Sequence, residues 1–160
     1  MIIRDYRPGD FPQIEALWKE TGVFRSERGD SPEIILCCNS QGGKFLILED
    51  EINKRIVGTS WLTWDGRRLM MQYFTVLPSQ QGLGYGRKLA LESLAFSRNK
   101  KAPLKLEVHR DNIPAIQLYK NLGFKILEGY EVYLVYHDER FTSYSFWSSH
   151  CPLLLSQIPG

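Results

Sequence analysis

The chain has 160 residues, of which 43% are hydrophobic and 24% are charged, and its formal net charge is +2. This length favours one domain with a single core, and the composition is typical of an ordinary globular protein. No long block of lysine and arginine concentrates the small positive charge, which argues against nucleic acid as a partner.

Cysteine usage, histidine spacing and the first residues bear on the cellular setting. The three cysteines form no CxxC pair and the three histidines lie far apart, so the sequence predicts neither a disulfide framework nor a metal site. The opening MIIRDYRPGDF is charged by its fourth residue, and no apolar run has the length of a membrane span. We therefore expect a cytoplasmic protein with no membrane partner.

The first half of the chain predicts one strand, two helices and an antiparallel meander. Residues 1–7 resemble a short strand, Asp10 can cap the helix that follows, and Ser31 before Pro32 marks the start of a second helix. A polar loop separates the two helices. Three strands joined by short turns come next, at 44–50, 55–64 and 68–77.

The second half predicts two more helices and three more strands. A helix from about Tyr85 to Arg98 leads to a strand at 103–109. The next helix ends at Gly123, and four of its residues share one face: Ala115, Leu118, Tyr119 and Leu122. A short hairpin around Gly129, within residues 124–137, is expected to close the core.

The predicted order β-α-α-β-β-β-α-β-α-β-β is a mixed α/β (α+β) fold with a mostly antiparallel sheet. Because a helix connects the fourth and fifth strands, these two strands should be parallel. Residues 1–138 form the expected domain. Residues 139–160 have poor periodicity and are expected to be a C-terminal appendage of unknown role.

The stretch SQQGLGYGRKLA, residues 79–90, joins a predicted strand to a predicted helix and carries Gly82, Gly84 and Gly86. Glycine-rich backbone at a helix N-terminus offers unpaired N–H groups to an anion, most often a phosphate. A P-loop would need a hydroxyl residue that is absent here, and the G-x-G-x-G spacing is one residue short of the dinucleotide fingerprint. A dinucleotide-binding oxidoreductase remains a distant alternative.

With its flanks, this stretch resembles the acetyl-CoA site of the GNAT superfamily of N-acetyltransferases. Gln81, Gly84 and Gly86 match the family pattern Arg/Gln-x-x-Gly-x-Gly/Ala. The pattern N-x-x-A-x-x-L-Y-x-x-x-G-F is matched by Asn112, Ala115, Leu118, Tyr119, Gly123 and Phe124. The resemblance implies the GNAT fold, with the sheet splayed between its fourth and fifth strands.

The resemblance also implies that acetyl-CoA is the co-substrate and that no metal takes part. Main-chain N–H groups of residues 81–87 would hold the CoA diphosphate, and the pantetheine arm would pair with the strand edge near Val76, whose N–H would face the acetyl carbonyl. The implied cofactor-binding residues are Phe74, Thr75, Val76, Gln81, Gly82, Leu83, Gly84, Tyr85, Gly86, Arg87, Asn112 and Tyr119.

Two residues are candidates for catalysis. Tyr119 corresponds to the family tyrosine that protonates the leaving sulfur, although the same position suits a core tyrosine. Glu107, five residues before Asn112, resembles the general base of the branch that acetylates protein N-termini. The alternative is a strand-edge glutamate paired with Lys105 or Arg110.

The resulting hypothesis is an N-acetyltransferase that moves acetyl to a primary amine by direct attack in a ternary complex. The acceptor would be an amine-bearing small molecule or peptide, and a homodimer is possible. The acceptor pocket could be lined by aromatic residues and carboxylates, namely Trp61, Trp64, Tyr73, Glu27, Asp30 and Glu33. A non-catalytic acetyl-CoA-binding regulatory module is the alternative from another class.

Overall fold

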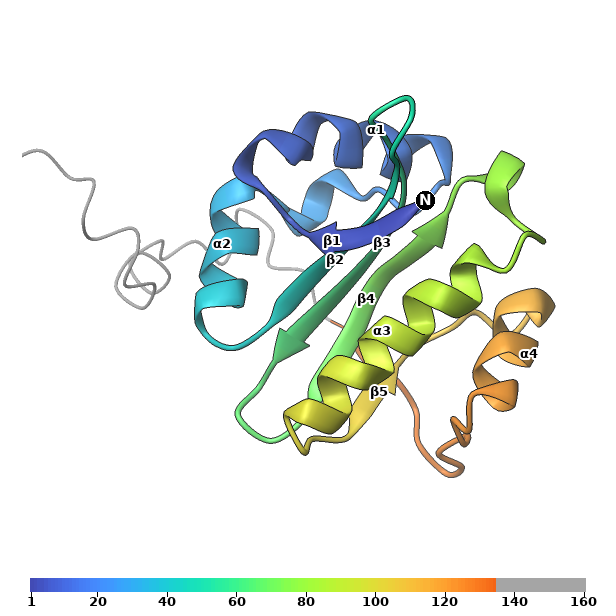
Figure 1. The fold of residues 1–160 in the computed structure, drawn as a ribbon. Helices are drawn as coiled ribbons and strands as arrows, with labels where there is room; N and C mark the ends of the chain where they lie inside the picture. The colour runs from blue at the N-terminus through green and yellow to red at the C-terminus, as the bar shows by residue number, and fades with distance from the viewer. Residues whose placement is uncertain (135–160) are drawn as a thin grey trace, which may run out of the picture. The chain divides into compact units, whose positions relative to one another are not determined.

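The computed structural model describes residues 1–134, and the chain divides into two units, residues 1–124 and 125–160. The first unit holds a five-stranded sheet and four α-helices (Figure 1). In chain order these are β1 (Ile2–Asp5), α1 (Phe11–Glu20), α2 (Pro32–Ser40), β2 (Lys44–Asp50), β3 (Arg55–Trp64), β4 (Leu69–Val76), α3 (Tyr85–Asn99), β5 (Leu104–Leu106) and α4 (Ile113–Asn121). No helix among residues 1–134 is long and apolar enough to cross a bilayer.

The strands lie in the order β1-β2-β3-β4-β5. Strands β1 to β4 pair antiparallel with one another, and β5 runs parallel to β4. This mixed sheet confirms the predicted fold class, including the parallel pair that α3 connects. Asp65 makes the tight turn between β3 and β4, since its Oδ1 accepts hydrogen bonds from the N–H groups of Arg67 and Arg68.

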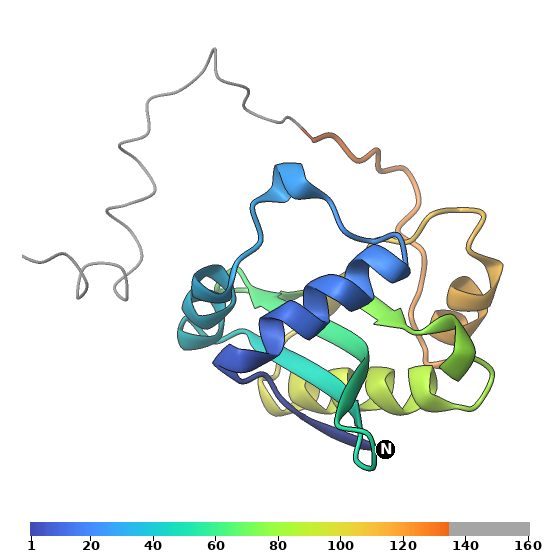
Figure 2. The same cartoon turned by 90° about the horizontal axis from the view of Figure 1, so that it is seen from above.

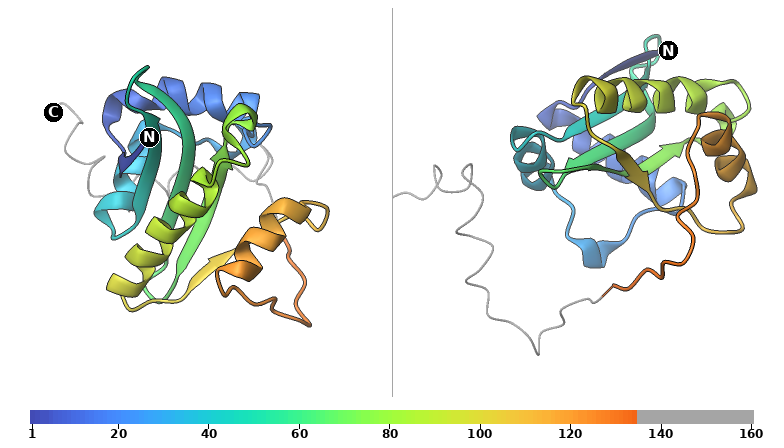
Figure 3. Two further views of the ribbon diagram at one scale, coloured as in Figure 1. Left: turned by 45° about the vertical axis from the view of Figure 1, so that its right-hand side comes forward. Right: turned by 90° about the horizontal axis from the view of Figure 1, so that it is seen from below.

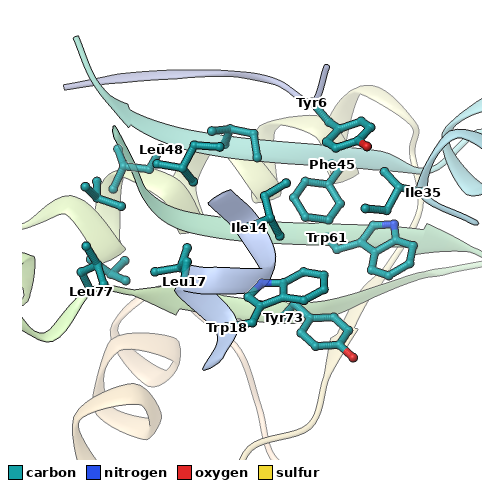
Figure 4. Close-up of a cluster of buried hydrophobic side chains, with 14 residues drawn as sticks. Tyr6, Ile14, Leu17, Trp18, Ile35, Phe45, Leu48, Trp61, Tyr73 and Leu77 are labelled. Carbon is teal, nitrogen blue, oxygen red and sulfur yellow. The ribbon is translucent and has the colours of Figure 1, made fainter. Parts of the chain in front are cut away.

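Two hydrophobic cores lie on the two faces of the sheet, because successive strand residues point to opposite sides. Figure 2 shows the sheet between α1 and α3. On the face of α1 and α2, Trp18 and Ile35 pack against Phe45, Trp61 and Tyr73 (Figure 4). On the face of α3 and α4, a second cluster forms from buried residues that include Leu46, Leu62, Met71, Leu89 and Tyr119. Each fully buried large apolar side chain contributes about 2 kcal/mol.

Asp10 lies at the N-terminal end of α1, as the sequence predicts, but its carboxylate does not cap the helix. It accepts hydrogen bonds from the guanidinium of Arg4, at 2.7 and 2.8 Å, and from the N–H of Arg7. Burial alone would raise the pKa of Asp10, but the bonds from Arg4 and Arg7 outweigh it and hold that pKa below its usual value. Arg4 therefore ties β1 to the start of α1.

Two predicted elements differ from the structure. The fifth strand ends at Leu106 instead of residue 109, and residues 125–134 form no strand. The apolar side chains of residues 125–134, such as Ile126 and Val132, are largely exposed. A strand persists only where a neighbour accepts its hydrogen bonds, and among residues 1–134 none pairs with this segment. The rest of the expected hairpin, the expected domain end at 138 and the appendage at 139–160 lie outside the described residues.

Candidate functional site

The sheet opens between β4 and β5. The two strands pair only from Leu69 opposite Leu104 to Met71 opposite Leu106. β4 continues to Val76 with no fifth-strand partner, and Figure 3 shows the two strands diverging. Among residues 1–134, the main-chain groups of residues 72–76 that face away from β3 therefore pair with no strand, which confirms the predicted splay.

A β-bulge interrupts β4 within this free edge. Thr75 lies opposite Thr59 and Gln72 lies opposite Trp61, so Tyr73 and Phe74 share one partner position. Tyr73 has a φ of 46°, in the left-handed region that few residues other than glycine adopt. The two side chains of the bulge lie on opposite faces of the sheet, Tyr73 against Trp18 and Phe74 against Tyr119.

A buried chain of hydrogen bonds holds the bulge in place. The indole N–H of Trp18 donates to the hydroxyl of Thr59 at 3.0 Å, and that hydroxyl donates to the carbonyl of Tyr73 at 2.7 Å. Thr59 has no exposed surface. The chain links α1, β3 and β4, so the strained backbone of Tyr73 is fixed from the core side.

The end of β4 turns the main-chain groups of Val76 toward the open edge. The N–H of Leu77 donates to the carbonyl of Val57, and alternate residues of an antiparallel strand face alternate sides. Val76 therefore faces away from β3, whereas Thr75, opposite Thr59, faces it. The carbonyl of Val76 accepts a hydrogen bond from Nε2 of Gln81 at 2.9 Å.

The loop between β4 and α3 presents bare N–H groups. Gly82 and Gly84 adopt φ values of 75° and 82°, which glycine reaches without steric cost, and a Cβ on either would meet nothing within 4 Å. The first α-helical bond of α3 runs from the N–H of Lys88 to the carbonyl of Gly84. Within residues 1–134, the N–H groups from Gly82 to Arg87 have no main-chain or side-chain acceptor among the hydrogen bonds outside the helix ladder. This arrangement suits an anion.

Three elements converge beside this loop. A Cβ on Gly86 would lie 3.8 Å from Cδ2 of Leu118 and 4.0 Å from Cγ2 of Val76, which are ordinary contact distances. The first turn of α3 is thus close to both α4 and the end of β4. The glycine loop, the open edge of β4 and the helix that carries Tyr119 therefore lie close together.

Tyr119 lies on the buried face of α4 and is 7% exposed. Its ring makes edge contacts with Phe74, at 5.8 Å between centroids, and with Phe124, at 5.6 Å. Within the described residues its hydroxyl has no hydrogen-bond partner. Burial raises the pKa of Tyr119 to about 12, so the phenol keeps its proton at neutral pH.

Asn112 occupies the N-cap of α4. Its Oδ1 accepts a hydrogen bond from the N–H of Ala115 at 3.3 Å. The N-cap role of Asn112 is therefore filled by the oxygen alone. In the part of the chain described here, no acceptor lies against its amide nitrogen, which leaves two donors for a ligand.

Glu107 follows the last residue of β5 and lies on the surface. Its Oε1 pairs with Nζ of Lys105 at 3.2 Å, and their side chains are 46% and 40% exposed. Glu107 is therefore not buried at the split between β4 and β5. The structure instead contains the alternative pairing with Lys105.

Asp30 is a carboxylate in the loop before α2, and it contacts a side chain of β4. The hydroxyl of Tyr73 donates a short hydrogen bond to Oδ2 of Asp30, and the guanidinium of Arg28 lies over the Tyr73 ring, 5.4 Å from its centre. Burial raises the pKa of Asp30, although the bond from Tyr73 and the charge of Arg28 act in the opposite direction. Burial and the bond to Asp30 raise the pKa of Tyr73 to about 12.

The other residues suggested for the acceptor pocket are less well placed. Glu27 and Glu33 are exposed. Trp64 packs with the cluster on the opposite face, under Nζ of Lys100. Trp61 stacks beside Tyr73 and is a core residue, although its buried indole N–H has no partner within residues 1–134.

No group of three or more histidine, cysteine or acidic residues within residues 1–134 could hold a metal ion. The N–H groups that suit a phosphate are therefore the best-defined ligand feature of the described chain.

Comparisons with known proteins agree with this geometry. Residues 11–124 match the model of the acetyltransferase (GNAT) family. An acetyltransferase of Yersinia pestis is 28% identical over 127 residues, covering 78% of this chain and 88% of the relative. A GNAT-family acetyltransferase of Staphylococcus aureus Mu50 superposes with a TM-score of 0.67 at 21% identity, over 78% of this chain and 82% of that one. An acetyltransferase of Streptococcus agalactiae also gives 0.67, at 23% identity, over 86% and 92%.

Proposed function

The chain belongs to the acetyltransferase (GNAT) family, and we propose that it transfers the acetyl group of acetyl-CoA to a primary amine by direct attack in a ternary complex. The observation that carries this proposal is the convergence of the bare N–H groups of residues 82–87 with the open edge of β4. A diphosphate fits the first feature, and the amides of an extended pantetheine arm fit the second.

The proposed contacts use groups that have no partner within residues 1–134. The N–H groups from Gly82 to Arg87 hold the diphosphate, and the edge at Phe74 and Val76 pairs with the arm. The amide nitrogen of Asn112 donates to the same arm. Thr75 contributes through its position in the strand, since its main chain faces β3.

Acetyl-CoA supplies a thioester whose acyl carbon is open to attack by an amine. The N–H of Val76 donates to the carbonyl oxygen, where negative charge develops. Tyr119 holds a proton at neutral pH and gives it to the departing sulfur. Phe74, packed on the Tyr119 ring, keeps the phenol in place and excludes water from it.

Direct attack needs no nucleophile from the protein. Cys38, on α2, is a half-buried free thiol. Burial and the nearby charge of Asp30 raise the pKa of Cys38, which makes it a poor nucleophile at neutral pH. This supports a ternary complex over an acetyl-enzyme formed on Cys38.

Glu107 is the proposed base for the proton that the amine loses. The substitution Glu107→Gln tests this role, with Lys105→Met as the matched control, because it removes the other half of the same ion pair. A base predicts a kcat that falls about 100-fold in the first variant only. Equal, small effects in both variants would leave Glu107 as a surface pair.

Binding and turnover separate the proposal from its alternatives. Calorimetric titration with acetyl-CoA and with NADH, followed by release of CoA thiol in the presence of a panel of primary amines, tests all three. We expect acetyl-CoA binding and amine-dependent thiol release. Binding without release for every amine would favour a regulatory module, and binding of NADH alone would favour an oxidoreductase.

A further inference from the structure

The loop from Arg25 to Asp30 brings an acidic and a basic group to one aromatic ring. Asp30 accepts the hydrogen bond of the Tyr73 hydroxyl, and Arg28 lies over the Tyr73 ring. Trp18 stacks on the same ring at 3.9 Å between centroids. Tyr73 is 7% exposed, so its aromatic surface is almost entirely covered by Trp18, Arg28 and their neighbours.

These groups have the chemistry of a cation site. A carboxylate beside an aromatic ring binds an ammonium or guanidinium ion by charge and by the negative face of the ring. Here a guanidinium from the chain itself is already over the ring. The side chain of Arg28 is exposed, so a competing cation can replace it without opening the core.

Tyr73 connects this cluster to the proposed acetyl-CoA site. Tyr73 and Phe74 form the bulge of β4, and Phe74 contacts Tyr119 across the ring edge. A cation bound at Tyr73 therefore lies on the α1 and α2 face of the strand, one residue along the chain from Phe74, which packs on the proposed acid on the other face.

We propose that Asp30 and the ring of Tyr73 bind the positively charged amine of the acceptor, and that Arg28 occupies this site until the acceptor displaces it. The inference rests on the proposed function for the identity of the ligand as acceptor. The proposed acceptor is an alkylamine that is cationic at neutral pH, and Arg28 competes with it for the same site.

Binding can be measured without turnover. The probe is n-butylammonium, with n-butanol as its uncharged control, and the readout is the set of tryptophan indole N–H signals in ¹⁵N-labelled protein. Arg28→Ala removes the competitor, and Arg28→Ala/Asp30→Asn also removes the negative charge while keeping an oxygen that accepts from Tyr73. Arg25→Ala is the matched control, because it removes a positive charge from the same loop, where the hydrogen bonds of the Arg25 side chain within residues 1–134 go to the carbonyls of Gly22 and Phe24.

We expect Arg28→Ala to bind n-butylammonium about tenfold more tightly than the unmodified protein, and the double variant to lose this gain. The Arg25→Ala variant and the n-butanol titrations should show no gain. Equal affinity in Arg28→Ala and the unmodified protein, or in the single and double variants, would overturn the inference. Circular dichroism establishes that each variant is folded before it is titrated.

Kinetics then separate this inference from the proposed function. With any amine that the protein acetylates, Asp30→Asn should raise the KM for the amine about tenfold and leave the KM for acetyl-CoA within about twofold. Turnover with an unchanged amine KM would overturn the inference and leave the proposed function standing. If no amine is acetylated, the proposed function fails, while the n-butylammonium titration still decides whether Asp30 and Tyr73 bind cations.

Discussion

The side-chain amide of Gln81 donates a hydrogen bond to the main-chain carbonyl of Val76, with 2.9 Å between Nε2 and the oxygen. Gln81 belongs to the glycine loop, and Val76 is the last residue of β4. One side chain therefore fixes the distance between the N–H groups proposed to hold a diphosphate and the N–H proposed to face the acetyl carbonyl.

Substitution of Gln81 should weaken acetyl-CoA binding more than folding. Gln81→Ala removes one hydrogen bond, so the KM for acetyl-CoA should rise about fivefold. Gln80→Ala is the matched control, because no hydrogen bond of its side chain is formed within residues 1–134. Steady-state kinetics check this, and the same KM for both variants would show that the Gln81 bond does not position the loop.

A methyl group on Gly86 should separate binding from stability. Ala is favoured over Gly in a helix by about 0.5–1 kcal/mol, and the new Cβ meets Leu118 and Val76 at ordinary distances. Gly86→Ala should therefore melt at the same or a higher temperature than the unmodified protein. If acetyl-CoA enters the space between α3, α4 and β4, the variant should bind acetyl-CoA about tenfold more weakly than the unmodified protein. Scanning calorimetry measures the melting temperature, and titration calorimetry measures the affinity for acetyl-CoA. An unchanged affinity would show that acetyl-CoA binds elsewhere.

Removal of the Tyr119 hydroxyl should slow the chemical step. Tyr119→Phe keeps the ring contacts with Phe74 and Phe124, and kcat should fall about 100-fold with little change in acetyl-CoA binding. Since the pKa of Tyr119 is raised to about 12, the phenol stays protonated and should cause no loss of rate between pH 7 and about pH 10. Rate–pH profiles of both proteins test this. A Tyr119-dependent loss of rate in that range, or an unchanged kcat in the variant, would remove Tyr119 from the mechanism.

The bulge of β4 should depend on the hydroxyl of Thr59. Thr59→Val keeps the shape of the side chain but leaves the indole N–H of Trp18 and the carbonyl of Tyr73 without their partner. Loss of these bonds should lower the free energy of unfolding by about 2 kcal/mol. Thr59→Ser keeps the hydroxyl and should lose less. Denaturant titrations compare the two, and a loss in Thr59→Ser that exceeds the loss in Thr59→Val would show that the methyl group matters more than the hydroxyl.

Most elements of this fold can be predicted from the sequence, because their signals are local. The strands β2 and β3 begin and end where apolar runs meet turn residues, and Ser31 caps α2 because its hydroxyl oxygen accepts a hydrogen bond from the N–H of Ile34. The end of β5 at Leu106 is different. The pattern LKLEVH alternates beyond that residue, but β4 no longer lies beside it, and a sequence does not record which strand edge is left open.

The residues of the candidate site likewise divide into those that the sequence indicates and those whose contacts only the structure shows. The glycines are found by their spacing at a strand-to-helix junction, because an anion loop needs them near one another in the chain. Tyr119 is found by the motif that resembles the GNAT family. The contact of Tyr73 with Asp30 joins residues 43 positions apart, and no local rule pairs them. The bulge at Tyr73 and the bond from Gln81 to Val76 likewise arise only when the sheet has formed. Sequence reasoning therefore proposed Asp30 and Tyr73 for the acceptor side separately, without their contact.

The structure of the protein bound to CoA tests the central claim most directly. We expect the diphosphate within hydrogen-bond distance of the N–H groups from Gly82 to Arg87, the arm along the edge of β4, and the sulfur within reach of the Tyr119 hydroxyl. A diphosphate bound away from that loop, or a phenol turned away from the sulfur, would contradict it.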